Sequence, residues 1–237
     1  MKKLLLLLFI VGYSVQGLFA QFSIGPELGM NLSTINETTP SGTTTLNGLN
    51  GLALSYNYTY GARAGVMMEY GITDDIAVQS GVYYSMLGAK ITAQNLVYQG
   101  IKSSVGESSK NINYFSVPVY AVYKADAGKG RFFVGLGMYA SFGVGGIVKT
   151  GAINLDTLGT YPSSSRNVTF GSDSASVKAL DYGIGAITGY QFENGFILRL
   201  GYNYGLANYS NLKGTTTSNS CFFFSLAWLF SNNSGRR

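Results

Sequence analysis

The 237-residue sequence contains no histidine. Histidine titrates near neutral pH and is a common general base and metal ligand. Its absence excludes Ser-His-Asp chemistry and any metal site that needs an imidazole. The adjacent carboxylates Asp74 and Asp75 fall in a short polar stretch, where a solvated turn explains them. The glycine-rich residues 143–148 lack the Lys-Ser/Thr that completes a phosphate-binding loop. We therefore expect no catalytic residues, no cofactor and no metal ion, and hence no enzyme.

Cysteine and charge are also scarce. Cys221 is the only cysteine, so no disulfide within the chain can stabilise the fold. Charged residues make up 11% of the sequence, against about a quarter in ordinary soluble domains. Of 16 Lys and Arg, 14 remain after Lys2 and Lys3 are set aside, and 14 − 11 leaves a net charge of +3. This charge is too weak and too scattered to suggest a nucleic-acid partner.

Long apolar runs are missing beyond the N-terminus, so no transmembrane helix is expected there. At the N-terminus, Lys2 and Lys3 precede an apolar run over residues 4–11, and a small residue, Ala20, precedes Gln21. This order is typical of a secretory signal peptide. An anchor helix is the alternative, but the run covers only about half of the ~20 residues that a span needs. We assign residues 1–20 to a cleaved signal peptide and residues 21–237 to the mature domain.

Glycine, tyrosine and phenylalanine are abundant instead, with 32, 18 and 14 copies. In eight segments the apolar residues recur at every second position, which is the period of a β-strand. Each segment has about the 9–11 residues that cross a bilayer as a tilted strand. The segments are residues 22–32, 62–72, 76–86, 112–124, 132–142, 181–193, 196–206 and 220–230. Residues 112–124 are apolar on both faces, so their phase stays open.

The connections alternate in length. The three short ones are residues 73–75, residues 125–131 and the pair Asn194-Gly195, a hairpin turn signal. The four long ones are residues 33–61, 87–111, 143–180 and 207–219, rich in Thr, Ser, Asn and Gly. Outer-membrane barrels have an even strand count, short periplasmic turns and long external loops. The sequence therefore predicts an all-β, eight-stranded, antiparallel, up-and-down transmembrane barrel in the outer membrane.

The strand face opposite the apolar one carries glycines and a few charges. Eight strands enclose a lumen that side chains just fill, so these charges must lie inside and must pair. We predict a structural lumenal charge network of Glu27, Arg63, Glu69 and Arg199. Pro26 lies in the first strand and cannot donate a ladder hydrogen bond, so we expect a bulge or a locally open seam there.

Aromatic residues near strand ends are expected at the membrane interface, where amphipathic rings gather. We predict this position for Tyr70, Phe192, Trp228 and Phe230. The tyrosines at 56, 58 and 60 suit contact with a protein or glycan, and they suit a strand that extends above the membrane equally well. We favour the extended strand.

The order and spacing of several short motifs resemble the PorT-like family of small eight-stranded outer-membrane barrels. These motifs are Gly29-Met30-Asn31-Leu32-Ser33, Tyr114-Phe115-Ser116-Val117-Pro118, Gly135-Leu136-Gly137-Met138-Tyr139, Asp181-Tyr182-Gly183 and Arg199-Leu200-Gly201-Tyr202. The resemblance implies a membrane-embedded protein; most such barrels have no assigned activity, and a few serve type IX secretion or gliding. The last strand, with Trp228 and Phe230, resembles the signal that the barrel-assembly machinery reads.

These observations predict a monomeric, plugged barrel with a structural or partner-binding role, embedded in outer-membrane lipid. A diffusion pore is the second hypothesis, but open channels belong to barrels of ~16 strands. The third is a component of a type IX-like secretion apparatus, or an adhesin that binds protein or glycan through its external loops.

Overall fold

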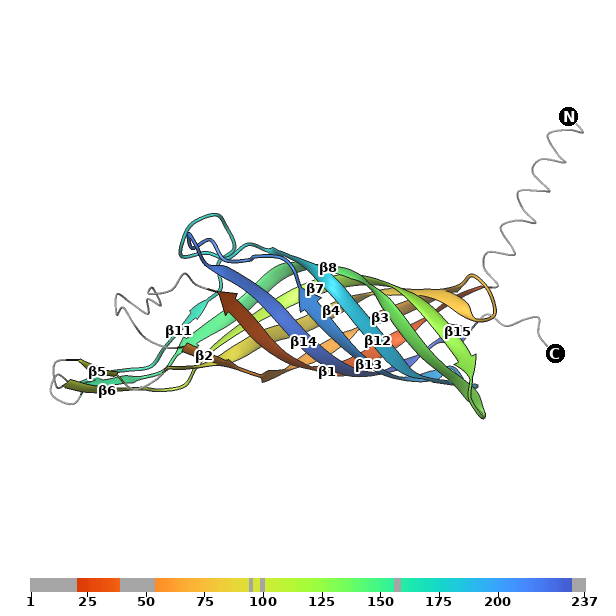
Figure 1. The fold of residues 1–237 in the computed structure, drawn as a ribbon, viewed down its shortest axis with the longest axis horizontal. Helices are drawn as coiled ribbons and strands as arrows, with labels where there is room; N and C mark the ends of the chain where they lie inside the picture. The colour runs from red at the N-terminus through yellow and green to blue at the C-terminus, as the bar shows by residue number, and fades with distance from the viewer. Residues whose placement is uncertain (1–20, 39–53, 94–95, 99–100, 156–158, 232–237) are drawn as a thin grey trace, which may run out of the picture.

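The computed structural model describes residues 21–38, 54–93, 96–98, 101–155 and 159–231. The predicted signal peptide, residues 1–20, lies outside them. Eight long strands form the barrel: β1 (Phe22–Thr38), β3 (Thr59–Gly71), β4 (Ile76–Ala93), β7 (Ser108–Asp126), β8 (Gly130–Thr150), β12 (Leu180–Phe192), β13 (Phe196–Gly205) and β14 (Thr216–Trp228). Each pairs antiparallel with two neighbours in the ring β1-β3-β4-β7-β8-β12-β13-β14. The predicted fold class is confirmed (Figure 1).

Seven short strands extend this ring. β2 (Leu54–Asn57) pairs with β4, β11 (Ser164–Asn167) with β8, and β15 (Phe230–Ser231) with β1. A separate four-stranded sheet has the order β10-β9-β6-β5. Its strands are β5 (Leu96–Tyr98), β6 (Ile101–Val105), β9 (Ile153–Leu155) and β10 (Gly159–Tyr161). β5 and β6 project from one end of the barrel, which we call the loop end (Figure 1). In the described ranges, no helix has the length and apolar character to cross a membrane.

The strands run further toward the loop end than the sequence predicts. β1 continues to Thr38, β4 to Ala93 and β8 to Thr150, so the expected starts of three long loops, at residues 33, 87 and 143, are wrong. β8 has 21 residues, about twice what a bilayer crossing needs. The ladder continues there, with Asn36 opposite Ser218 for example. The apolar alternation ends earlier, because above the membrane neither face has to be apolar.

The opposite end, which we call the turn end, carries the three predicted short connections. In the connection between β12 and β13, Gly195 has a φ of +84°, the left-handed region that favours glycine. The Asn194 side chain caps this turn by accepting a hydrogen bond from the Phe196 amide at 3.1 Å. Arg131 joins the other two turns through ion pairs with Asp75 at 2.6 Å and Asp126 at 2.8 Å.

The barrel closes where β1 meets β14 and β15. Glu27 pairs with Ala227, and Ile24 pairs with Phe230, in one continuous register. Between these two pairs, the ladder that joins β1 to β14 and β15 is interrupted at Gly25 and Pro26. On the other side of β1, the pairing of Pro26 with β3 is intact. The seam around Pro26 is therefore a local gap in the ladder, and the expected bulge is absent from this part of the described chain.

Alternation along each strand separates a lumenal face from an outer face. The phase of residues 112–124, which the sequence leaves open, is now fixed: Tyr114 and Tyr120 point inward and are buried, while Phe115 and Tyr123 are exposed on the outside. Most large outward residues on the eight strands are apolar and exposed, as a lipid-facing band requires.

Candidate functional site

The centre of the lumen holds an ion cluster built on Glu27. Its carboxylate pairs with Arg63 at 3.2 Å and with Arg199 at 2.9 Å, and it accepts a hydrogen bond from the Tyr83 hydroxyl at 2.9 Å. These side chains come from β1, β3, β13 and β4, which meet only when the barrel is closed. Glu27 and the Arg199 side chain are 0% exposed. The cluster thus links both sides of the seam through the barrel interior.

Aromatic rings complete the surroundings of the two guanidinium groups. Arg63 lies 3.7 Å from the Tyr83 ring centroid and 4.6 Å from that of Phe223. Arg199 lies 5.2 Å from the Tyr120 ring centroid. Such cation–π contacts are worth about 0.5–2 kcal/mol each when water is excluded. They offset part of the cost of burying two positive charges against one carboxylate.

A second ion cluster lies nearer the turn end. Lys124 of β7 pairs with Glu69 of β3 at 2.5 Å and donates to the Gln191 side-chain oxygen at 2.6 Å. The Gln79 amide donates to the other Glu69 oxygen at 2.8 Å. The four predicted charges therefore do not form one network, because Glu69 belongs to this separate cluster. Sequence reasoning missed Lys124, since it ends the segment whose two faces could not be told apart.

Large aromatic residues fill the space between the clusters, and the sequence analysis did not single them out. Tyr83 and Phe133 are fully buried. Each ring lies against a glycine of a neighbouring strand: a Cβ on Gly65 would come within 2.7 Å of Tyr83, and one on Gly189 within 2.5 Å of Phe133. The lumenal glycines thus create room for aromatic rings. The occurrence of glycines opposite aromatic residues was the sequence signal that could have predicted these buried rings.

The loop end of the lumen is closed by the segment that follows β13. Tyr209 is fully buried and packs with Ile35, Leu87, Ile112 and Tyr114. Its backbone amide donates to the Thr217 carbonyl at 3.0 Å. Burial raises the pKa of the Tyr209 hydroxyl well above its ordinary value. With its buried ring, against which the Lys110 ammonium nitrogen lies 4.6 Å from the centroid, Tyr209 acts as a stopper in the barrel mouth.

A small polar cavity lies between the central cluster and this stopper. Its lining includes Arg63, Ser116, Ser141 and Asn219. Its volume is about 10 Å³, about the space for one water molecule. Nearby, the Asn219 amide donates to the buried Asp181 carboxylate at 2.9 Å. The cavity is a gap in a packed interior, and its size does not admit a solute.

The four predicted interface aromatics all lie at the turn end. Trp228 and Phe230 are exposed on the outer face, Phe192 is exposed to 37% and Tyr70 is half-buried. Trp228 pairs in register with Phe196, whose ring centroid is 5.8 Å from that of Phe192. Tyr60 belongs to β3 and Tyr56 to β2, while Tyr58 lies between these two strands, so all three are at the loop end of the wall.

The two ion clusters hold strands of the barrel wall together across the lumen. In the portion of the chain that the structure describes, no three His, Cys, Asp or Glu side chains gather to hold a metal ion. Each acid of the two clusters is paired with a cation, and the Cys221 thiol is buried. What the arrangement does chemically is to neutralise charges inside a closed wall.

A family model described as "Outer membrane protein beta-barrel domain" matches residues 19–211. The chain is similar to the solved structure of Ail, the attachment invasion locus protein of Yersinia pestis, at 14% identity and a TM-score of 0.34, covering 89% of this chain and 99% of that one. OprG from Pseudomonas aeruginosa matches at 12% identity and a TM-score of 0.41, with 87% and 95% covered. AlkL matches at 16% identity and a TM-score of 0.36, with 90% and 93% covered. The search of curated proteins gave no significant match.

Proposed function

The chain belongs to the outer membrane protein β-barrel domain family, and from this membership we propose that it is a non-enzymatic wall protein of the outer membrane, without an open pore, that binds a partner at its loop end. The observation that carries the first part is the filled lumen. Arg199, Tyr83, Tyr120 and Phe133 are all fully buried inside a ring of only eight strands. Barrels of this size have interiors that side chains fill, whereas aqueous channels need about twice as many strands.

Planar-bilayer recording tests the absence of a pore. We expect the purified, heat-modifiable protein to give no stepwise conductance, because the central cluster and the Tyr209 stopper block the same axis. A 16-stranded porin inserted in the same bilayer serves as the positive control. Reproducible single-channel steps from this protein, at protein amounts where insertion is verified, would overturn the proposal.

The length of the strands supports the partner-binding part. β4, β7 and β8 have 18, 19 and 21 residues, so each projects well beyond the ~10 residues that a bilayer crossing needs. The sheet of β5, β6, β9 and β10 extends this projection at the loop end. Among the residues that the structure describes, its outer strands, β5 and β10, each pair with one neighbour. Unpaired strand edges are ready acceptors for a further strand or peptide.

Replacement of residues 92–107 by an Asn-Gly turn tests this role. Ile91 and Ser108 face each other in the β4–β7 ladder, so a two-residue hairpin can join them while β5 and β6 are lost. Proteins cross-linked to the wild type in intact cells, and purified from solubilised membranes, should disappear from the variant. Lys129→Ala at the turn end is the control and should keep them. Identical cross-linked sets from all three proteins would contradict loop-end binding.

Several finer assignments are part of this proposal. Within the family we infer a PorT-like barrel, supported by the motifs in β1, β7, β8, β12 and β13. We also infer cleavage after Ala20, insertion by the barrel-assembly machinery and a monomeric state. Among captured partners, periplasmic or secretion subunits would place the protein in a type IX-like apparatus, whereas ligands bound from outside intact cells would make it an adhesin.

A further inference from the structure

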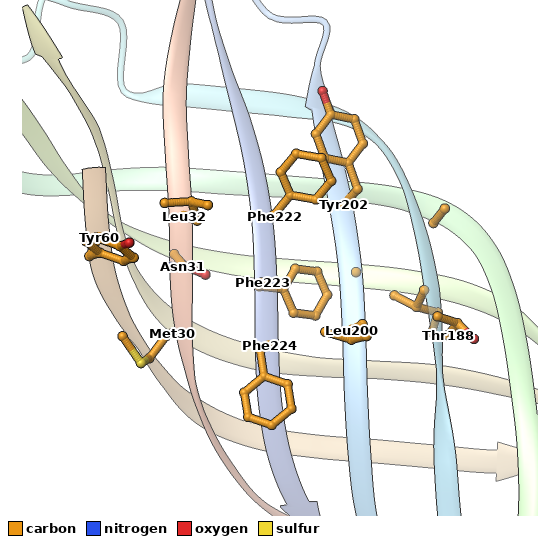
Figure 2. Close-up of a pocket in the computed structure, with 13 residues that line it drawn as sticks. Met30, Asn31, Leu32, Tyr60, Thr188, Leu200, Tyr202, Phe222, Phe223 and Phe224 are labelled. Carbon is orange, nitrogen blue, oxygen red and sulfur yellow. The ribbon is translucent and has the colours of Figure 1, made fainter. Parts of the chain in front are cut away.

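A groove of about 640 Å³ crosses the outer face of five neighbouring strands, β3, β1, β14, β13 and β12 (Figure 2). Its large side chains are apolar or aromatic and include Met30, Phe222 and Tyr202. Met30 is 57% exposed and Phe222 is 48% exposed, so the groove opens toward lipid and not toward the lumen. Ala186 and Thr188, whose side chains are short, and Gly201 line the part of the groove over β12 and β13.

Two polar side chains of the lining, Thr188 and Asn31, form hydrogen bonds within the wall. The Thr188 hydroxyl donates to the Phe133 carbonyl at 2.9 Å, and the Asn31 amide donates to the Met86 carbonyl at 3.2 Å. Figure 2 shows the Tyr202 hydroxyl pointing away from Leu200, toward the loop end. Apart from the hydroxyls of Tyr202 and Tyr60, the groove therefore offers hydrocarbon contacts.

The groove lies in the half of the apolar band nearer the loop end. Along β14 the outward residues from the turn end are Trp228, Leu226, Phe224 and Phe222, followed by Ser220 and Ser218. Along β1 the outward apolar series ends at Leu32 and continues with Thr34 and Asn36. The groove takes in the last two apolar rows of both strands, directly below the polar rows. In a barrel with external loops, this depth is the outer leaflet.

We propose that the groove binds one acyl chain of an outer-leaflet lipid. Its volume is within the range of about 300–1,000 Å³ that is usual for ligand pockets. Thr34 and Ser220 face each other just above the groove and are buried, whereas Tyr60 is 75% exposed, so the Tyr60 hydroxyl lies where the head group of that lipid would be. Because the contacts are apolar, the groove recognises the acyl chain, and the lipid head group contributes little to the affinity.

Native mass spectrometry of the full chain in mild detergent tests this inference. Delipidated protein is titrated with palmitoyl-oleoyl phosphatidylethanolamine and, separately, with the phosphatidylglycerol that carries the same chains. We expect one retained lipid per barrel, with similar affinity for both head groups. Ala186→Phe should weaken lipid retention at least tenfold, because the added ring would occupy the groove where Ala186 lines it. Met30→Trp is the second filling variant.

Ala140→Phe is the matched control. Ala140 is also exposed on the outer face, in β8, but it does not line the groove. This variant should retain lipid like the wild type, and heat-modifiable migration shows that each variant is folded. Equal retention by the filling and control variants would overturn the proposal. A strong preference for one head group would overturn it as well. A dimer of the wild type that only the filling variants abolish would also overturn it, because a second copy of the chain would then occupy the groove.

Discussion

Glu27→Gln is expected to lower the free energy of unfolding by about 3–5 kcal/mol, the usual cost of breaking a buried ion pair by removing one partner. The change keeps the shape of the side chain but removes the one carboxylate that both Arg63 and Arg199 contact. Two buried guanidinium groups are then left without a counter-charge. Their cation–π contacts persist but are too weak to replace it.

The thermal midpoint of heat-modifiable migration and urea unfolding in detergent micelles both measure this loss. Glu107→Gln is the control, because Glu107 forms an exposed ion pair with Lys90 at 3.1 Å and should cost about 0–1 kcal/mol. A triple variant that also carries Arg63→Met and Arg199→Met should recover most of the stability, since apolar replacements of whole buried clusters are often neutral. A Glu27→Gln barrel as stable as the control would show that the cluster is not a structural centre.

The strand count and the short turns followed from the sequence because the lipid and the lumen demand opposite side chains at alternate positions. Where both faces are apolar, as in residues 112–124, this contrast fails. The lumenal face carries the large aromatic side chains Tyr114 and Tyr120, and the outer face carries Phe115 and Val119, so large hydrophobic residues occur on both. Only the pairing of β7 with β4 and β8 fixes the phase.

The sequence predicted which acidic and basic residues lie in the lumen more completely than it predicted which of them pair with each other. Glu27, Arg63 and Arg199 lie together, as expected for lumenal charges that must pair. The separation of Glu69 depended on the stagger between strands, which brings Lys124 of β7 beside β3 across the lumen. Stagger is a property of the closed ring and has no signature within a single strand.

The structure of the loop end was the part of the fold that the sequence predicted least well. Above the bilayer the two strand faces meet similar surroundings, so the extensions of β1 and β8 carry no period-two pattern of hydrophobicity. The extension of β4 does alternate, but its apolar residues Leu87 and Ala89 are buried and no longer on the outer face. The Tyr209 stopper lies in a loop, and its burial depends on the apolar residues Ile35 and Ile112, which come from distant strands. Closure of the mouth is therefore visible only in the folded chain.

Gly25→Val is the second substitution with a large expected effect, because it acts on the seam that closes the ring. A Cβ atom at Gly25 would lie 1.6 Å from the Trp228 carbonyl oxygen and 2.7 Å from its carbonyl carbon. These are backbone atoms and cannot rotate away. The Leu229 amide holds the same stretch by donating to the Gly195 carbonyl at 2.9 Å, so the strain cannot be relieved by a free strand end.

We expect the valine to separate β1 from the β14–β15 junction and to disrupt the neighbouring Ile24–Phe230 pair. The cost should reach or exceed the upper end of the ~1–3 kcal/mol typical of overpacking. Refolding into detergent, followed by comparison of boiled and unboiled samples on a gel, reports the folded fraction. Gly145→Val is the matched control, because the nearest atom to a Cβ there is the Asn113 amide nitrogen at 4.0 Å. If both variants fold to the wild-type extent, closure does not depend on the close approach at Gly25. If Gly25→Val alone fails, the gap in the ladder beside Pro26 is a site where only glycine lets the last strand reach the first.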